Sequence, residues 1–73
     1  MNAKAVPEVE HYSNGGVKLT GSRLDGEFHG AWEWYRLDGS LMRSGQFERG
    51  RQVGIWRTFD RSNRLVKETD FGG

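Results

Sequence analysis

A repeated spacing of glycine and aromatic residues restricts the fold of this chain more than any other feature. Six residues recur when the sequence is shifted by 24 positions, and an earlier, partial copy begins near Gly15. The matched pairs are Gly21/Gly45, Gly26/Gly50, Gly30/Gly54, Trp32/Trp56, Leu41/Leu65 and Phe47/Phe71. Because the matches fall on glycines and large apolar residues, they indicate a structural unit that is repeated in tandem.

Each unit has the pattern of a β-hairpin. An aromatic strand over Ala31–Arg36 is followed by Asp38-Gly39, a strong hairpin-turn signal, and by a return strand over Leu41–Glu48. A polar link, Glu48 to Gly54, leads to the next unit. The expected elements of that second unit are a strand over Ile55–Asp60, a turn at Ser62-Asn63 and a return strand over Arg64–Phe71. No segment has the apolar period of a helix.

The predicted fold is therefore all-β: a single twisted antiparallel sheet of tandem β-hairpins, a meander, with a period of about 24 residues. We expect residues 1–10 to form a flexible N-terminal tail and residues 11–73 to form the repeat domain. Within that domain, 11–24 is a partial repeat with a return strand over Lys18–Leu24. Residues 25–48 and 49–73 are the complete repeats.

Glycine inside a strand suggests where the rings pack. Gly45 falls within a predicted strand, where glycine usually permits the close approach of a ring or of another backbone. Trp32 and Trp56 are the predicted rings for such positions. Trp34 is replaced by Thr58 in the next unit, so the fold does not require a ring there. Trp34 is consequently a candidate contact residue.

Length, charge and cysteine content exclude several classes of protein. The 73 residues allow one domain, and a formal net charge of +1 gives no bulk attraction to nucleic acid or to anionic membranes. The chain has no cysteine, which excludes disulfides, thiolate zinc sites and thiol nucleophiles and favours a reducing, cytoplasmic location. The N-terminal residues do not resemble a signal peptide, and no stretch is apolar enough to span a membrane.

The residues that commonly carry catalysis do not form a recognisable constellation. His11 and His29 have no ligand partners at metal-binding spacings, and Asp25 and Glu27 flank a glycine turn where solvation explains both carboxylates. The loop from Gly26 lacks the lysine and hydroxyl ending of a phosphate loop. We therefore expect no enzymatic activity, no metal and no cofactor.

The glycine and aromatic spacing resembles the MORN repeat, over about residues 11–73. The resemblance is carried by the stretch Gly45–Trp56, by Asp25–Trp32 and by Tyr35 with Asp38-Gly39, although Arg23 stands where an aromatic residue is usual. The spacing is closest to a bacterial variant found in proteins labelled as antitoxins of toxin–antitoxin pairs. The resemblance implies an elongated sheet of hairpins that acts as a binding or scaffolding surface.

So few repeat units also imply a partner. Repeat units are stabilised by stacking on their neighbours, and about three or more are normally needed. A flat sheet leaves two edges and a face uncovered. We therefore expect a protein-interaction module, antitoxin-like or a scaffold, that binds a protein partner or associates with itself, through a sheet edge or a sheet face.

An alternative function rests on an arginine stripe in the C-terminal half. This stripe would bind nucleic acid or an anionic membrane, with Trp34 as a stacking platform for bases. Its residues are Arg43, Arg49, Arg51, Arg57 and Arg64. The near-neutral net charge, and the acidic residues Glu48 and Asp60 that interrupt the stripe, argue against both ligands.

Overall fold

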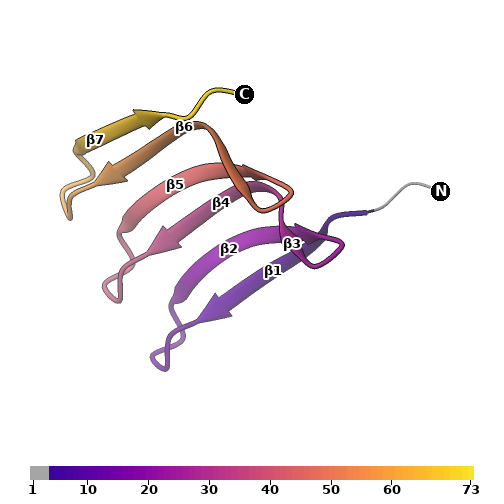
Figure 1. Ribbon diagram of the computed structural model, residues 1–73. Coiled ribbons are helices and arrows are strands. Elements are labelled where there is room, and N and C mark those ends of the chain that lie inside the picture. The colour runs from indigo at the N-terminus through magenta and orange to yellow at the C-terminus, as the bar shows by residue number, and fades with distance from the viewer. Residues whose placement is uncertain (1–3) are drawn as a thin grey trace.

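The computed structural model of the chain describes residues 4–73, and within that range it contains strands and no helix. Figure 1 shows the strands side by side in one layer. The strands are β1 (Val6–His11), β2 (Val17–Leu24), β3 (Glu27–Phe28), β4 (Gly30–Tyr35), β5 (Leu41–Glu48), β6 (Arg51–Phe59) and β7 (Leu65–Asp70).

All the strand pairs are antiparallel, and the order across the sheet is β1-β2-β4-β5-β6-β7, with the short β3 paired to β2. The prediction of an all-β, single antiparallel sheet in meander order is confirmed, while the 24-residue period stays an inference from the sequence. The sheet is open, with β1 at one edge and β7 at the other (Figure 1). It measures 43 × 31 × 12 Å, which leaves no room for a second layer about 10 Å away.

A single layer can bury very few side chains. Among the hydrophobic residues described, only Trp32 and Trp56 are buried, at 1% and 4% exposure. Each ring is enclosed by side chains of its own face and by the backbone below it. The core is therefore a row of side chains on one face of the sheet, not an interior between two layers.

Two tight turns join the hairpins to one another. Leu24 pairs with Glu27 around Asp25-Gly26. Glu48 pairs with Arg51 around Arg49-Gly50. Both central residues of each turn have positive φ, the signature of a type I′ turn. The expectation of a polar link over residues 48–54 is corrected, because the chain reverses within two residues and β6 already begins at Arg51.

Three wider turns close the hairpins at the opposite end of the sheet. In the middle turn, the Arg36 N–H donates to the Ser40 carbonyl at 2.8 Å and the Gly39 N–H donates to the Arg36 carbonyl at 2.9 Å. Only Gly39 has positive φ within Asp38-Gly39, so this is a wider turn than the two-residue form. Asn63 takes the glycine position in the last turn at φ 64°, as the sequence suggested.

The N-terminal segment differs from its prediction. Residues 1–10 were expected to be a tail, but residues 6–10 belong to β1, which pairs with β2 from Val6 opposite Arg23 to His11 opposite Val17. The earliest unit is thus a complete hairpin. Residues 1–3 lie outside the described part of the chain. The β1 strand has no Phe, Tyr or Trp and includes Pro7, a residue that is uncommon within strands, so the sequence did not mark it.

Candidate interaction surface

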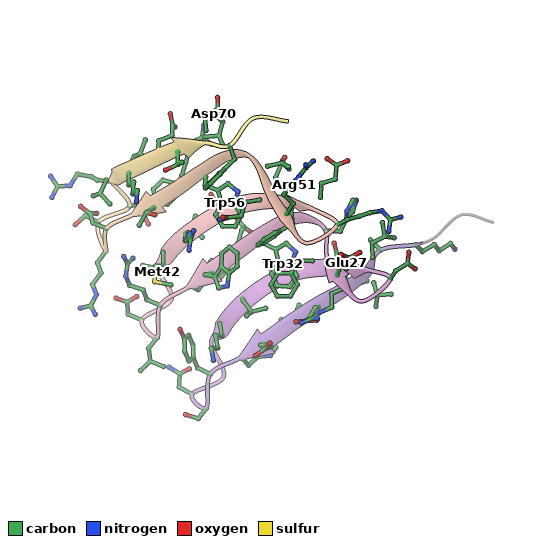
Figure 2. All side chains as sticks on the ribbon, in the orientation of Figure 1. Glu27, Trp32, Met42, Arg51, Trp56 and Asp70 are labelled. Carbon is green, nitrogen blue, oxygen red and sulfur yellow. The ribbon has the colours of Figure 1, made fainter. Side chains whose placement is uncertain are left out.

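The buried tryptophans pack on glycines of the preceding hairpin. A Cβ built on Gly21 would overlap the six-membered ring of Trp32, and a Cβ on Gly45 would overlap the same ring atoms of Trp56. Figure 2 shows both indoles on the same side of the sheet. The sequence prediction that these rings cover strand glycines is confirmed.

The indole nitrogens are paired with backbone carbonyls. Trp32 Nε1 donates to the carbonyl of Ser22 at 3.0 Å, and Trp56 Nε1 donates to the carbonyl of Gln46 at 3.2 Å. A buried N–H without an acceptor would cost free energy, so these bonds allow the whole indole to be enclosed. The two contacts also fix how each hairpin lies against the preceding one.

Further rings extend the two indoles into a continuous aromatic surface. Trp34 lies between Trp32 and Trp56, with ring centroids 6.0 and 5.5 Å away, and Phe47 meets the Trp56 ring edge-on at 5.1 Å. We call this surface the aromatic face. Its rings are Phe28, Trp32, Trp34, Phe47, Trp56 and Phe71.

Cations lie among the rings of the aromatic face. The Arg43 guanidinium lies 4.7 Å from the Trp56 ring and 5.8 Å from the Trp34 ring. The Arg23 guanidinium lies 4.7 Å from the Phe28 ring and pairs with Glu8 at 2.6 Å. Arg23, which takes the place of an expected aromatic residue, therefore covers a ring by cation–π contact.

A hollow of about 480 Å³ opens at the C-terminal end of the aromatic face. Trp56 and Phe71 supply its rings, whose centroids are 6.2 Å apart, and Phe71 is 46% exposed. The residues that line it are Met42, Arg43, Trp56, Thr58, Lys67, Thr69 and Phe71. It combines apolar surface, two hydroxyls and two cations, which suits a ligand with an apolar part and a negative charge.

The opposite face of the sheet is polar. Arg57 pairs with Glu68 at 2.9 Å, and the Tyr35 hydroxyl donates to the Glu33 carboxylate at 3.2 Å. Partial burial, then the negative charge of Glu33 and its hydrogen bond, raises the pKa of the Tyr35 hydroxyl above its ordinary value. The charged groups of this face named here are paired, whereas Arg43 on the aromatic face contacts rings and forms no ion pair among residues 4–73.

The structure brings together only two of the predicted site residues. Trp34 and Arg43 are paired across β4 and β5 on the aromatic face, where Trp34 is half-buried. Arg57 follows Trp56 in β6 and lies on the polar face. The remaining arginines, Arg49, Arg51 and Arg64, lie in or beside the turns at the two ends of the sheet.

Those turn arginines have carboxylate partners. Arg49 pairs with Asp25 at 3.3 Å and Arg51 pairs with Glu48 at 3.8 Å, in and beside the tight turns. Arg64 pairs with Asp60 at 3.3 Å in the wide turn at the other end of the sheet. The five arginines therefore do not form one stripe. Sequence reasoning could not separate the faces, because the register of the β5–β6 pair, which places Thr58 and not Arg57 opposite Arg43, has no local sequence signal.

Sequence reasoning also missed Lys67, Thr69 and Phe71 as surface-lining residues. The sequence did offer one signal: Thr58 is a small residue at the position where the preceding unit has Trp34, and it leaves space there.

No group of His, Asp and Glu among residues 4–73 is arranged to hold a metal ion. The same range includes no helix that could cross a membrane. Comparison with protein-family models, curated proteins and solved structures finds no match to this chain.

Proposed function

We propose that this chain is a non-enzymatic protein-interaction module whose aromatic face receives a protein partner. The observation that carries the proposal is the row of six rings on one face of a sheet that has no second layer. Around the buried Trp32 and Trp56, the rings of Phe28, Trp34 and Phe47 are half-buried and Phe71 is exposed, and exposed apolar surface of this kind typically marks an interaction site. Aromatic residues and arginine are also enriched at the centres of protein interfaces.

The biological setting is part of the same proposal. We infer a short MORN-like repeat protein, antitoxin-like or a scaffold, that works in the bacterial cytoplasm. The packing of Trp32 on Gly21 and of Trp56 on Gly45 supports a tandem repeat of this type. The lack of cysteine supports a reducing compartment.

Site-specific crosslinking tests the proposed function. A photoreactive benzophenone amino acid is placed at Trp34 on the aromatic face and, as the matched control, at Ser44 on the polar face. We expect the Trp34 position to crosslink one protein that the Ser44 position does not reach. That protein is then purified and titrated against wild type and Trp34→Asp. Equal affinity for both chains contradicts the proposal.

The alternative function, binding of nucleic acid or an anionic membrane, is not favoured and has a test of its own. Binding of a nucleic acid through several arginines would weaken steeply with added salt. Because Arg57 and Arg43 lie on opposite faces and four of the five arginines have carboxylate partners, no continuous basic surface supports this function. Salt-sensitive binding of an oligonucleotide that Arg49→Glu with Arg51→Glu abolishes would restore it.

A further inference from the structure

The two edges of the sheet are not equivalent. The edge strand β1 contains Pro7, which has no N–H to donate to a further strand, and proline is a common device that blocks edge pairing. The other edge, β7, contains no proline, and Leu65 and Val66 on it are 51% and 61% exposed. The β7 edge is therefore the one open to an added strand.

The fold itself shows what an added strand does on the aromatic face. When β6 pairs with β5, Trp56 lies on Gly45, and Thr58, two residues later, lies opposite Arg43. When β4 pairs with β2, Trp32 lies on Gly21 and Trp34 lies opposite Leu19. Each incoming strand thus delivers two side chains, spaced i and i+2, to the aromatic face of the preceding hairpin.

On β7, the corresponding positions are occupied by Lys67 and Thr69. Lys67 stands 24 residues after Arg43, and Thr69 stands 24 residues after Gly45. Both line the hollow, which lies where the next incoming strand would place its side chains. Unlike Gly45, Thr69 has a Cβ, which prevents a ring of the incoming strand from lying flat on the backbone. That ring would instead lie against Phe71 and the edge of Trp56.

The charge of the hollow defines the second part of the ligand. Among residues 4–73, no carboxylate forms an ion pair with Arg43 or Lys67. Between Lys67 and Thr69, Glu68 of β7 points to the polar face. It would repel an acidic residue of the incoming strand placed opposite it. An incoming strand is therefore favoured when its carboxylate lies on the aromatic face only.

We propose that the β7 edge binds an extended segment of a partner protein by antiparallel strand addition, with a large apolar side chain in the hollow and an Asp or Glu two residues later beside Lys67. This inference rests on the proposed interaction function and names the site and the chemistry of the partner. Main-chain hydrogen bonds to β7 supply affinity, and the alternating side chains supply specificity.

A designed peptide tests this proposal directly. The probe is the blocked peptide Thr-Lys-Trp-Lys-Glu-Val-Thr, whose Trp and Glu project from one face of a strand. The control is Thr-Lys-Trp-Glu-Lys-Val-Thr, which has the same composition but carries the carboxylate on the other face. Affinity is measured by calorimetry, and backbone amide NMR shifts report the location. We expect the probe to bind at least about tenfold more tightly than the control, with shifts in β7 and at the Trp56 indole.

Variants of the protein test the two halves of the site separately. We expect Lys67→Glu to weaken probe binding by about tenfold or more, whereas Lys4→Glu, a matched charge reversal outside the sheet, leaves it unchanged. Phe71→Ala removes the exposed ring that the Trp of the probe would contact in the hollow. It should weaken probe binding by about tenfold or more, and the unfolding temperature of the variant shows that the sheet is still folded.

Several outcomes would overturn the proposal. They are equal affinity for the two peptides, no binding up to about millimolar probe, or unchanged binding by Phe71→Ala. Sedimentation of the protein alone tests a second copy as occupant: self-association that Lys67→Glu abolishes replaces the partner strand by another copy and contradicts the proposal. If the probe fails but the protein crosslinked at Trp34 still binds, only the β7 inference falls and the interaction function stands.

Discussion

The packing of Trp56 on Gly45 depends as much on the missing side chain as on the ring. Glycine in a strand costs about 0.5–1 kcal/mol relative to alanine, because it orders a flexible backbone. Here that cost is offset by burial of an indole that is only 4% exposed and whose N–H reaches a backbone carbonyl. The same arrangement holds for Trp32 on Gly21. These contacts, predicted from residue spacing alone, join neighbouring hairpins.

We predict that Gly45→Ala destabilises the fold by about 1–3 kcal/mol, the usual cost of overpacking. The added methyl group would overlap the Trp56 ring, and the alternative to the overlap is displacement of the indole from its carbonyl partner. The measurement is chemical denaturation followed by tryptophan fluorescence. Gly16→Ala is the control, because its Cβ would meet only the flexible end of Asn14. An unchanged midpoint for Gly45→Ala would contradict the packing argument.

Asp38 makes stability depend on acid pH. The backbone N–H of Ser40, then its hydroxyl, and to a smaller extent Arg61 and Arg36, lower the pKa of the Asp38 carboxyl. Since the folded-state pKa lies below the unfolded value of about 3.9, the stabilisation is fully present above that pH and is lost as pH falls through the lower folded-state value.

The corresponding test compares unfolding midpoints of wild type and Asp38→Asn between neutral and strongly acidic pH. We expect the variant to lose less stability on acidification than wild type, because its side chain does not titrate. Ser40→Ala, which removes the donating hydroxyl, should fall between the two chains. Identical pH profiles for all three would show that the turn hydrogen bonds do not favour the charged carboxylate.

The wide turns are linked to one another by side chains that reach along the same end of the sheet. The Tyr12 hydroxyl donates to the Tyr35 carbonyl at 2.7 Å, and the Arg36 guanidinium donates to the Phe59 carbonyl at 2.6 Å. Two chemically different side chains thus satisfy equivalent carbonyls of the following hairpin. In the last turn, Asp60 has only acceptor atoms when ionised and instead binds N–H groups within its own turn.

We predict that Arg36→Met costs about 1.5–3 kcal/mol and Tyr12→Phe costs about 0.5–1.5 kcal/mol of unfolding free energy. The first bond is charge-assisted and the second is neutral, which sets their order. Both substitutions retain most of the apolar part of the side chain, so denaturation curves report mainly the lost hydrogen bonds, which for Arg36 include longer ones to the Ser40 hydroxyl and the Leu41 carbonyl. A larger loss for Tyr12→Phe than for Arg36→Met would show that packing, not the donated hydrogen, links the turns.

The sequence predicted the repeated hairpins and the Trp-on-Gly contacts because both depend on local signals: turn residues, strand glycines and rings at matched spacing. It did not predict β1, whose strand includes Pro7 and has no Phe, Tyr or Trp to mark it. It also did not predict which arginines share a face. A shift of one residue moves every later side chain to the other face. The strand register that places Thr58 opposite Arg43, and the one-residue bulge between Trp34 and Tyr35, have no clear sequence signal.

The whole sheet lacks a second layer, so its stability depends on how many neighbours each strand has. The inner strands β4 and β5 each pair on both sides and lie beneath the rings, whereas β1 and β7 each pair on one side only. Most residues of β7 are exposed, and its pairing with β6 is supported on the polar face by one ion pair, Arg57 with Glu68. Exposed ion pairs of this kind contribute about 0–1 kcal/mol.

We therefore predict that amide hydrogen exchange is slowest in β4 and β5 and fastest in β7 among the strands. Local opening needs less free energy where few apolar contacts must be broken, so β7 should open from β6 without unfolding of the inner hairpin. The measurement is native-state exchange by NMR across increasing denaturant. Exchange of β7 amides should become slower when the Trp- and Glu-containing probe peptide is bound, because the peptide gives β7 a second neighbour. If β7 amides exchange as slowly as those of β5 in the free protein, the edge is already occupied by another copy and is not open to a partner.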